Sequence, residues 1–569
     1  MMQQSNSLGR IGLLFFVFCS IALASVCEAN EKPPAWPTFV DQFIAGYFEQ
    51  QPTFAAEAGR HEYDGRLPDW SPQGLRNTER WLEAQRMLAL AYPDQALTPE
   101  QRFERDYLLA TVTKELFWRQ VVRRPYKSPQ FYAGALDPNL YISRPYAPPA
   151  ERMRAFIVYA SNVPQAAAQI RANLELPLPR TYIDIGKTVF GGLAKFYEAE
   201  AKGAFAEVAD PTLQREFADK VGPAAQALRE LADWLEQQRP TATDAFALGP
   251  EKFSRMLADT EAVELPLPKL EQMGRADLQR NLHALKQACR RFAPQATTAA
   301  CVAQAEAHKP PAGPVAAAGE QLKQLKAFVA ERQLLTIPSD DEANVAPSPP
   351  YARWNLAYID IPGPYEHGLP SVYYVAPPDP AWSAAEQAAY LPGQANLLFV
   401  SAHEVWPGHF LQFLHAHRAG SKFGQLFGSY AFSEGWAHYA EELMWEAGLN
   451  DGDPETHIGQ LVNALLRDVR FLAAIGLHTQ GWSLEQAEQM FREQAFRDPG
   501  NARQQAARGT FDPAYLNYTL GKLLIRQLRD DWCAQRGRRA AWRQFHDAFL
   551  SYGSPPIPLV AKAMLAGRD

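Results

Sequence analysis

The stretch that decides the fold is SAHEVWPGHFLQFLHAH, residues 401–417. In an H-E-x-x-H helix two histidines stand four positions apart on one face, where they can bind zinc. Here His409 follows His403 by six positions, and on an undisturbed α-helix that spacing turns the two side chains apart. Pro407 and Gly408 lie between them, and a proline inside a helix removes a hydrogen bond and breaks or kinks the helix. We therefore expect a kink at Pro407–Gly408 that returns His409 to the face of His403.

A catalytic zinc site needs a third protein ligand, and the segment FSEGWAHYAEEL, residues 432–443, offers one. Glu434 begins a predicted helix 25 residues after His409, which leaves enough chain for an antiparallel return. Three protein ligands keep the fourth coordination position for water. We expect His403, His409 and Glu434 to hold Zn²⁺, and Glu404 to accept a proton from the zinc-bound water.

The same residues also allow a purely structural interpretation. The two histidines would then be hydrogen-bonded core or surface residues, and Glu434 would be a carboxylate favoured by the dipole at a helix N-terminus. His438, one turn after Glu434, is the replacement ligand if the kink fails to bring His409 round. Glu441 lies two turns after Glu434 on the same face, and we expect it to orient a ligand histidine from behind the metal.

The motifs HEVWPGHFLQ (403–412) and FSEGWAHYAEEL resemble those of the bacterial domain-of-unknown-function 885 family, which is grouped with HExxH-type metallopeptidases. The resemblance covers essentially the whole mature chain, with further matching stretches at residues 52–69, 335–350, 470–487, 511–529 and 545–560. It implies a mostly helical, zincin-like fold. It also implies zinc ligands at His403, His409 and Glu434, with Glu404 as the catalytic base.

One position departs from the family pattern. The family usually carries an aspartate in the segment before its G-L-H, and this chain has Ala474 there, ahead of Gly476-Leu477-His478. A salt bridge or an orienting contact from that carboxylate is therefore absent. We expect the surroundings of Arg470 or His478 to differ accordingly, which affects substrate preference more than metal binding.

Other side chains are candidates for catalysis or substrate binding. Tyr518, which matches a family tyrosine, and His478 would stabilise the oxyanion of a tetrahedral intermediate, or would be core side chains with satisfied polar atoms. Tyr373 and Tyr374 lie on a predicted strand that either pairs with an extended substrate or is a buried aromatic strand. Arg470 is a candidate substrate contact.

Outside these motifs the pattern is mainly helical. Segments such as residues 223–238 repeat apolar residues at spacings of three and four. The run SVYYV, residues 371–375, is β-rich and is bounded by prolines, so it is a predicted strand. We predict a mainly α fold with a small β-sheet beside the metal-binding helices.

The domain organisation is predicted to be a single zincin-like catalytic domain over residues 30–569. Residues 309–319 are rich in Pro, Ala and Gly and are predicted to form an exposed loop. This loop separates a helical lobe, about 36–308, from a metal-site lobe, about 320–569, and we expect the two lobes to surround a cleft.

The N-terminus indicates export. Arg10 precedes an apolar run, residues 11–24, that is short for a membrane span and typical of a signal peptide, so residues 1–29 are the predicted signal. We expect a periplasmic or secreted protein with no transmembrane span after signal removal; lipidation at Cys27 is the less favoured alternative. In that oxidising compartment Cys289 and Cys301 either form a disulfide or stay as free buried thiols.

These observations favour a zinc-dependent hydrolase, specifically a metallopeptidase that cleaves short peptides. The formal net charge is −7 and no basic stripe appears, so nucleic acid is not an expected partner. Two alternatives stay open: a metal-dependent hydrolase of non-peptide amides or esters, and a non-catalytic periplasmic binding protein that contains a metal. The oligomeric state is not predicted.

Overall fold

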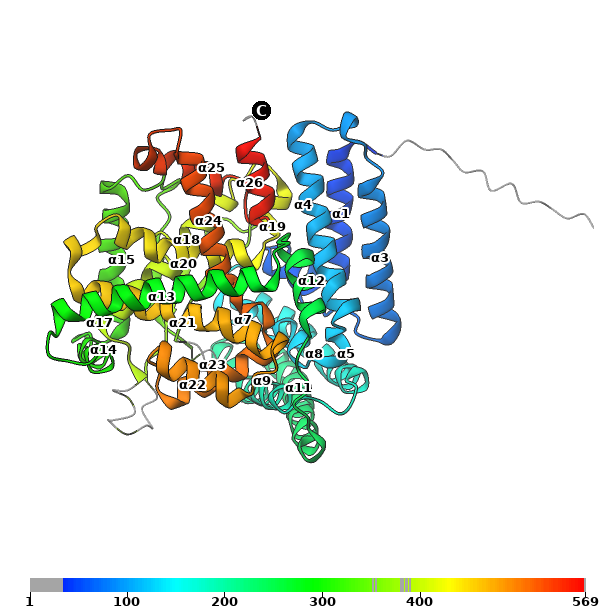
Figure 1. Ribbon diagram of the computed structural model, residues 1–569. Helices are drawn as coiled ribbons and strands as arrows, with labels where there is room; N and C mark the ends of the chain where they lie inside the picture. The colour runs from blue at the N-terminus through cyan, green and yellow to red at the C-terminus, as the bar shows by residue number, and fades with distance from the viewer. Residues whose placement is uncertain are drawn as a thin grey trace, which may run out of the picture.

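The computed structural model describes residues 34–349, 353, 356–378, 383, 387 and 390–566, and it is mainly helical with one small sheet (Figure 1). The predicted mainly α fold is therefore confirmed. The predicted signal peptide, residues 1–29, lies outside the described residues. Within the described part of the chain, no helix combines the length and the apolar character that crossing a bilayer requires.

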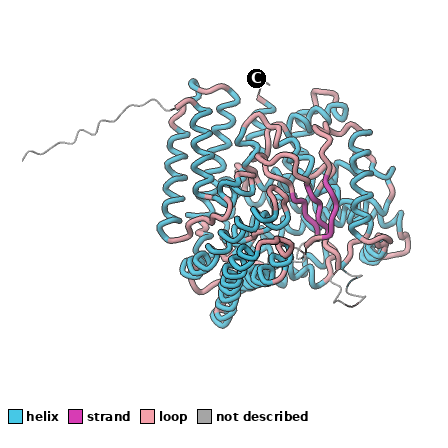
Figure 2. The backbone as a smooth tube through the Cα atoms, turned by 180° about the vertical axis from the view of Figure 1, so that it is seen from behind, coloured by secondary structure: helices cyan, strands magenta, loops and turns pink. Residues whose placement is uncertain are grey.

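The first described helices form an aromatic-rich unit at one end of the molecule. They are α1 (Trp36–Gln50), α2 (Pro52–Glu57), α3 (Pro72–Leu90) and α4 (Pro99–Leu116). The long helices α1, α3 and α4 stand side by side in Figures 1 and 2. Their buried aromatic side chains, including Phe43 and Tyr47, pack against Phe423 and Phe427 from the second half of the chain. This contact joins the N-terminal helices to the segment that follows the HEVWPGH motif.

A second helical unit follows, and α8, α9 and α11 are its long members. Its helices are α5 (Arg124–Lys127), α6 (Gln130–Ala133), α7 (Asn139–Ser143), α8 (Pro149–Asn173), α9 (Arg180–Glu198), α10 (Glu200–Ala204) and α11 (Pro211–Gln237). The periodic segment 223–238 lies in α11 apart from its last residue, Gln238, which caps the helix. Its residues Leu228, Leu231 and Leu235 are in the core. The helical interpretation of that segment is confirmed.

The remaining helices before the sheet are α12 (Pro250–Glu261), α13 (Leu267–Phe292), α14 (Thr298–Ala307) and α15 (Pro314–Glu331). The predicted loop 309–319 is therefore a loop only as far as Gly313. The helix begins at Pro314 because proline is well tolerated in the first helical turn, where its missing N–H costs nothing.

The second half of the chain carries the HEVWPGH motif and the FSEGWAH motif on neighbouring helices. These helices are α17 (Gln394–Glu404), α18 (His409–Ala416), α19 (Lys422–Leu426), α20 (Tyr430–Glu446), α21 (Pro454–Thr479), α22 (Leu484–Gln494), α23 (Pro499–Phe511), α24 (Asn517–Cys533), α25 (Trp542–Leu550) and α26 (Ile557–Leu565). The helices α17, α20 and α21 contact one another, and α24 packs along α20.

An apolar core crosses the predicted boundary near residues 309–319. Leu257 and Leu285, which belong to the predicted helical lobe, share one apolar core with Leu465 and Phe471 of α21. The reason is that α21 is buried on all sides between Ile458 and His478, apart from the half-buried Leu466. A helix that is buried all round needs neighbours on every face, so α12, α13 and α14 cover it.

The sheet has three strands, β1 (Ala343–Pro347), β2 (Ala357–Asp360) and β3 (Ser371–Val375), in the order β1-β3-β2. The strand predicted at residues 371–375 is thus confirmed as β3. It pairs in parallel with β1 and antiparallel with β2, so that Val345 and Ile359 both stand opposite Tyr373. Figure 2 shows the sheet enclosed among the helices.

A disulfide joins α13 to α14 through Cys289 and Cys301, which confirms the paired alternative. Both half-cystines are buried, whereas the buried Cys533 is free. The bridge closes a short loop with 12 residues of sequence separation. It therefore fixes the corner at which the chain turns back toward α21.

Replacing both Cys289 and Cys301 by Ser should lower the free energy of unfolding by about 3 kcal/mol, because the unfolded chain then regains the conformations that the closed loop excludes. Urea denaturation followed by circular dichroism measures this change. Reductant added to the wild-type protein should reproduce it, and an unchanged urea midpoint in both experiments would contradict the role of the bridge.

Candidate metal centre

The helix that carries His403 ends at Glu404, and a new helix begins at His409. In the connection the Trp406–Pro407 peptide bond is cis, and Gly408 N–H donates to the carbonyl of Ala402 at 2.9 Å. The indole N–H of Trp436 donates to the carbonyl of Pro407, also at 2.9 Å. The expected break at Pro407–Gly408 is present, and it brings the imidazoles of His403 and His409 to 4.9 Å between ring centroids.

Glu434 is brought to these histidines by α20. The side chain of Ser429 caps this helix by accepting from Phe432 N–H, and the carboxylate of Glu261 accepts from Ala431 N–H at 3.2 Å. Farther along, α20 crosses α24 where Gly435 meets Gly521. A Cβ on Gly435 would lie 2.5 Å from the Cα of Gly521, so the two helices approach this closely only because neither residue has a side chain. This crossing places Glu434 beside Tyr518 of α24.

The three predicted ligands converge on a common point. Glu434 Oε2 lies 3.3 Å from His403 Nε2 and 3.5 Å from His409 Nε2, and one ligand atom from each residue lies within 4.8 Å of the others. Glu434 Oε2 is buried and, among the described residues, has no hydrogen bond that meets the usual geometric limits. Ligands at roughly 2.1 Å from a tetrahedral zinc lie about 3.4 Å apart. Two nitrogens and one carboxylate oxygen with these separations fit a zinc ion.

Glu441 holds His403 from the side opposite Glu434. Its Oε1 lies 2.7 Å from His403 Nδ1 and 3.1 Å from the guanidinium of Arg467. Burial by itself lowers the pKa of His403, but the neighbouring carboxylates of Glu434 and Glu441 outweigh burial and raise it to about 9. The arrangement leaves Nε2 directed at the cluster, as expected of a ligand histidine with a carboxylate behind it.

A cavity of about 490 Å³ opens beside the three ligands. Glu404, Tyr518 and three arginines line it together with the ligands, and the residues before and along β2, from Leu356 to Ile359, form another wall. Burial raises the pKa of Glu404 and of Tyr518. The Tyr518 ring lies 6.2 Å from the His403 ring, centroid to centroid. The predicted base and the predicted oxyanion donor thus face one space next to the ligand cluster.

The structure does not bring His478 to this cavity. The two ring nitrogens of His478 lie 2.7 Å from the carbonyl of Gly509 and 3.3 Å from the backbone N–H of Leu248. Burial lowers its pKa to about 4, and its ring packs beside Phe246 and Phe253. His478 is therefore a core residue that joins backbone segments, and the prediction that it stabilises the oxyanion is wrong.

His438 is not part of the ligand cluster either, since the described residues that can share a metal are His403, His409 and Glu434. It is fully buried, with Nδ1 3.5 Å from Glu441 Oε2. Its place beside Glu441, behind His403, agrees with the predicted position outside the ligand set. His438 is not needed in place of His409, because the break at Pro407–Gly408 brings His409 next to His403 and Glu434.

Tyr373 and Tyr374 lie on the wrong strand to contact a substrate. β3 is the central strand, so both of its edges are already paired. Tyr373 is fully buried with its hydroxyl 3.3 Å from Ser401 Oγ, and Tyr374 stacks on Tyr358 at 5.1 Å. The edge strand β2 (Ala357–Asp360) borders the cavity instead.

Arg470 lines the cavity as predicted, and Arg467 and Arg508 join it although the sequence did not single them out. Arg467 precedes Arg470 by one turn of α21, so their spacing was a signal that both face one side. Arg508 lies in α23, where no motif marks it. Its place at the site follows only from how α23 packs on α21.

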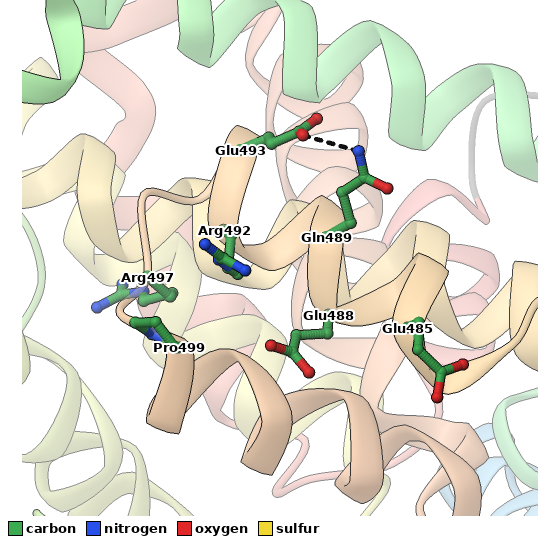
Figure 3. A pocket seen from close by; sticks show the side chains of 7 residues that line it. All are labelled: Glu485, Glu488, Gln489, Arg492, Glu493, Arg497 and Pro499. Carbon is green, nitrogen blue, oxygen red and sulfur yellow. Dashed lines mark hydrogen bonds between the residues drawn. The ribbon is translucent and has the colours of Figure 1, made fainter.

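Other hollows lie on the described surface, and two of them are larger than a few hundred cubic ångströms. One, of about 450 Å³, shares Ser433 and Glu434 with the cavity and extends toward α4 and α12. The other, of about 670 Å³, lies between α22 and α23 and is lined by charged side chains such as Glu488 and Arg492 (Figure 3). It shares no residue with the ligand cluster and is a solvated surface groove.

Gly408→Ala tests whether the break depends on a missing side chain. A Cβ at this position would lie 1.7 Å from the carbonyl oxygen of His403, and backbone cannot yield as a flexible side chain can. The variant should lose about 3 kcal/mol or more of stability, measured by chemical denaturation. Gly420→Ala is the matched control, because a Cβ there meets nothing within 4 Å. Equal stability of the two variants would show that the connection is not under this constraint.

Comparison with known proteins covers most of the chain. The family model described as "Bacterial protein of unknown function (DUF885)" matches residues 52–564. A solved structure of a "putative lipoprotein of unknown function" from Shewanella oneidensis has a TM-score of 0.76 at 22% identity, over 93% of this chain and 99% of that one. A second "putative lipoprotein", from Colwellia psychrerythraea, has a TM-score of 0.75 at 17% identity, over 93% and 98%.

At these identities the structural likeness concerns the fold alone. No curated protein matches the chain. The family model extends from α2 to α26 and includes every residue of the ligand cluster. The chain therefore belongs to the DUF885 family of bacterial proteins of unknown function.

Proposed function

We propose that this protein is a zinc-dependent hydrolase with a zincin-like site, and specifically a metallopeptidase that cleaves short peptides. The observation that carries the proposal is the convergence of His403, His409 and Glu434 beside a cavity that also contains the carboxylate of Glu404. A binding protein has no need of a base at that position. Zinc bound by two histidines and a carboxylate would supply Lewis-acid chemistry to water and to a scissile carbonyl.

The residues of the chain would divide the work of hydrolysis. Glu404 accepts the proton of the attacking water, whose oxygen bonds to the carbonyl carbon, and returns a proton to the amine as the C–N bond breaks. Tyr518 donates its hydroxyl proton in a hydrogen bond to the oxygen that becomes negative. Glu441 keeps His403 in one ring orientation through the 2.7 Å contact with Nδ1.

The shape of the site supports an extended substrate. The edge strand β2 borders the cavity, and its backbone could pair with a substrate backbone. The neighbouring hollow meets the cavity at Ser433 and Glu434, which leaves room on both sides of a scissile bond. We further propose that the protein works outside the cytoplasm, because its structural neighbours are described as lipoproteins and its N-terminus resembles a signal peptide.

Two variants test the roles of Glu404 and Glu434 separately. Glu404→Gln should bind one zinc per chain and lose at least a hundredfold in peptide hydrolysis, because the base contributes about that factor or more. Glu434→Ala should lose the zinc as well as the activity, because only two ligands remain. The measurements are zinc content by elemental analysis and cleavage of a mixed peptide library by mass spectrometry.

Glu493→Gln, on the exposed face of α22, is the matched control and should behave as the wild type. Full activity of Glu404→Gln would refute its role as the base. Turnover of esters or non-peptide amides alone, in a parallel panel, would refute the peptidase assignment while keeping the zinc hydrolase.

Glu441→Gln should weaken zinc binding roughly tenfold to a hundredfold, since the carboxylate that orients His403 is replaced by a neutral amide. Competition with a chelator of known affinity measures the change. Glu442→Gln is the control from the same helix, because Glu442 is equally buried but pairs with Arg280 and Lys522 away from the cluster. Equal loss of affinity in both variants would indicate general destabilisation of α20 instead.

A further inference from the structure

Three arginines face the cavity beside the ligand cluster, and two of them are already neutralised. Arg467 lies 3.1 Å from the carboxylate of Glu441, and Arg508 lies 3.0 Å from that of Asp512. Both also make hydrogen bonds to neighbouring oxygens, those of Asn463 and of Tyr430. The positive charges of Arg467 and Arg508 are therefore balanced by carboxylates of the protein.

Arg470 differs from the other two. Its side-chain Nε donates to the neutral amide oxygen of Gln505 at 2.8 Å, and among the described residues no carboxylate lies within ion-pairing distance of its guanidinium. The residue is only 7% exposed, and it lines the cavity. Ala474, one helical turn farther along α21, supplies no charge.

An unpaired guanidinium buried to this degree is costly, because it has given up most of its water without gaining an anion. Arginine presents two parallel N–H groups that match a carboxylate. A ligand carboxylate in the cavity would thus supply the partner that the described residues do not provide. The Tyr518 ring lies 5.0 Å from the Arg470 guanidinium and also packs beside the His403 ring. The Tyr518 ring therefore lies between the Arg470 cation and the ligand His403.

We propose that Arg470 binds a carboxylate of the substrate close to the scissile bond, so that the enzyme acts on peptides with a free C-terminus or an acidic side chain near that bond. This inference rests on the proposed hydrolase function for its meaning, although carboxylate binding can be measured without turnover. Because Arg470 and the ligand cluster line one cavity, the arrangement favours removal of residues from a C-terminus over cleavage within a long chain.

Gln505 offers a sharper test than removal of the arginine alone. Gln505→Glu has nearly the same shape and keeps the contact with Arg470, but it supplies an internal carboxylate that competes with the ligand. Arg470→Gln removes the cation itself. Arg503→Gln, an exposed arginine on the same helix as Gln505, controls for a general loss of positive charge.

The experiment measures binding by calorimetry to the zinc-loaded full chain carrying Glu404→Gln, which should bind without cleaving. The probes are acetyl-tetraalanine with a free carboxylate, the same peptide as its C-terminal amide, and an amidated peptide ending in aspartate. We expect the free acid to bind roughly tenfold to a hundredfold more tightly than the amide. The preference should fall below about threefold in Arg470→Gln and in Gln505→Glu, and persist in Arg503→Gln.

Equal affinity for the acid and the amide, or an undiminished preference in both Arg470→Gln and Gln505→Glu, would overturn the proposal. Tighter binding of the aspartate amide than of the free acid would assign the carboxylate to an acidic side chain. If the wild-type protein cleaves none of the peptides while the acid preference still depends on Arg470, the hydrolase function fails and the carboxylate site stands.

Discussion

Gly408 N–H donates to the carbonyl of Ala402, and its Cα approaches the carbonyl of His403 so closely that no side chain would fit. The geometry of the whole centre depends on this contact. It ends one helix at Glu404 and starts the next at His409, which lets two histidines six positions apart point to one carboxylate. The Trp436 indole holds the same connection by bonding to Pro407. Because Trp436 and Glu434 share α20, the helix that fixes the break also delivers the third ligand.

Burial of charge is the second organising feature. Glu441 is fully buried between His403 and Arg467, and one turn of helix away His438 occupies the space beside it. Next to this group Lys522 is buried with Asp277 and Glu442, so α13, α20 and α24 are joined by ion pairs. Removing one member of such a group leaves an uncompensated buried charge, which is strongly destabilising. The ion pairs therefore specify how these helices meet, and Arg470 is exceptional among the cavity arginines because its nearest partner is neutral.

The rim of the cavity is tied to the distant N-terminal part of the chain. Asp360, the last residue of the edge strand β2, accepts from the guanidinium of Arg144 at 2.8 Å. Arg144 also donates to the backbone carbonyl of Glu57 and to Glu366. Arg144 and Asp360 are 216 positions apart in the sequence. Arg144, the residue after α7, thus contributes to the site by holding the strand that borders it.

Sequence patterns alone predicted the mainly helical fold, the strand at residues 371–375, and the gathering of His403, His409 and Glu434. They could do so because helical periodicity, proline, glycine and motif spacing act locally. They misplaced His478, assigned the substrate strand to β3, and drew a lobe boundary that the core of α21 crosses. Only the tertiary structure decided those points, because strand order and the cover of a fully buried helix depend on distant segments. The same holds for the place of Arg508 and for the neutral partner of Arg470, Gln505, since the partner of a buried side chain depends on packing.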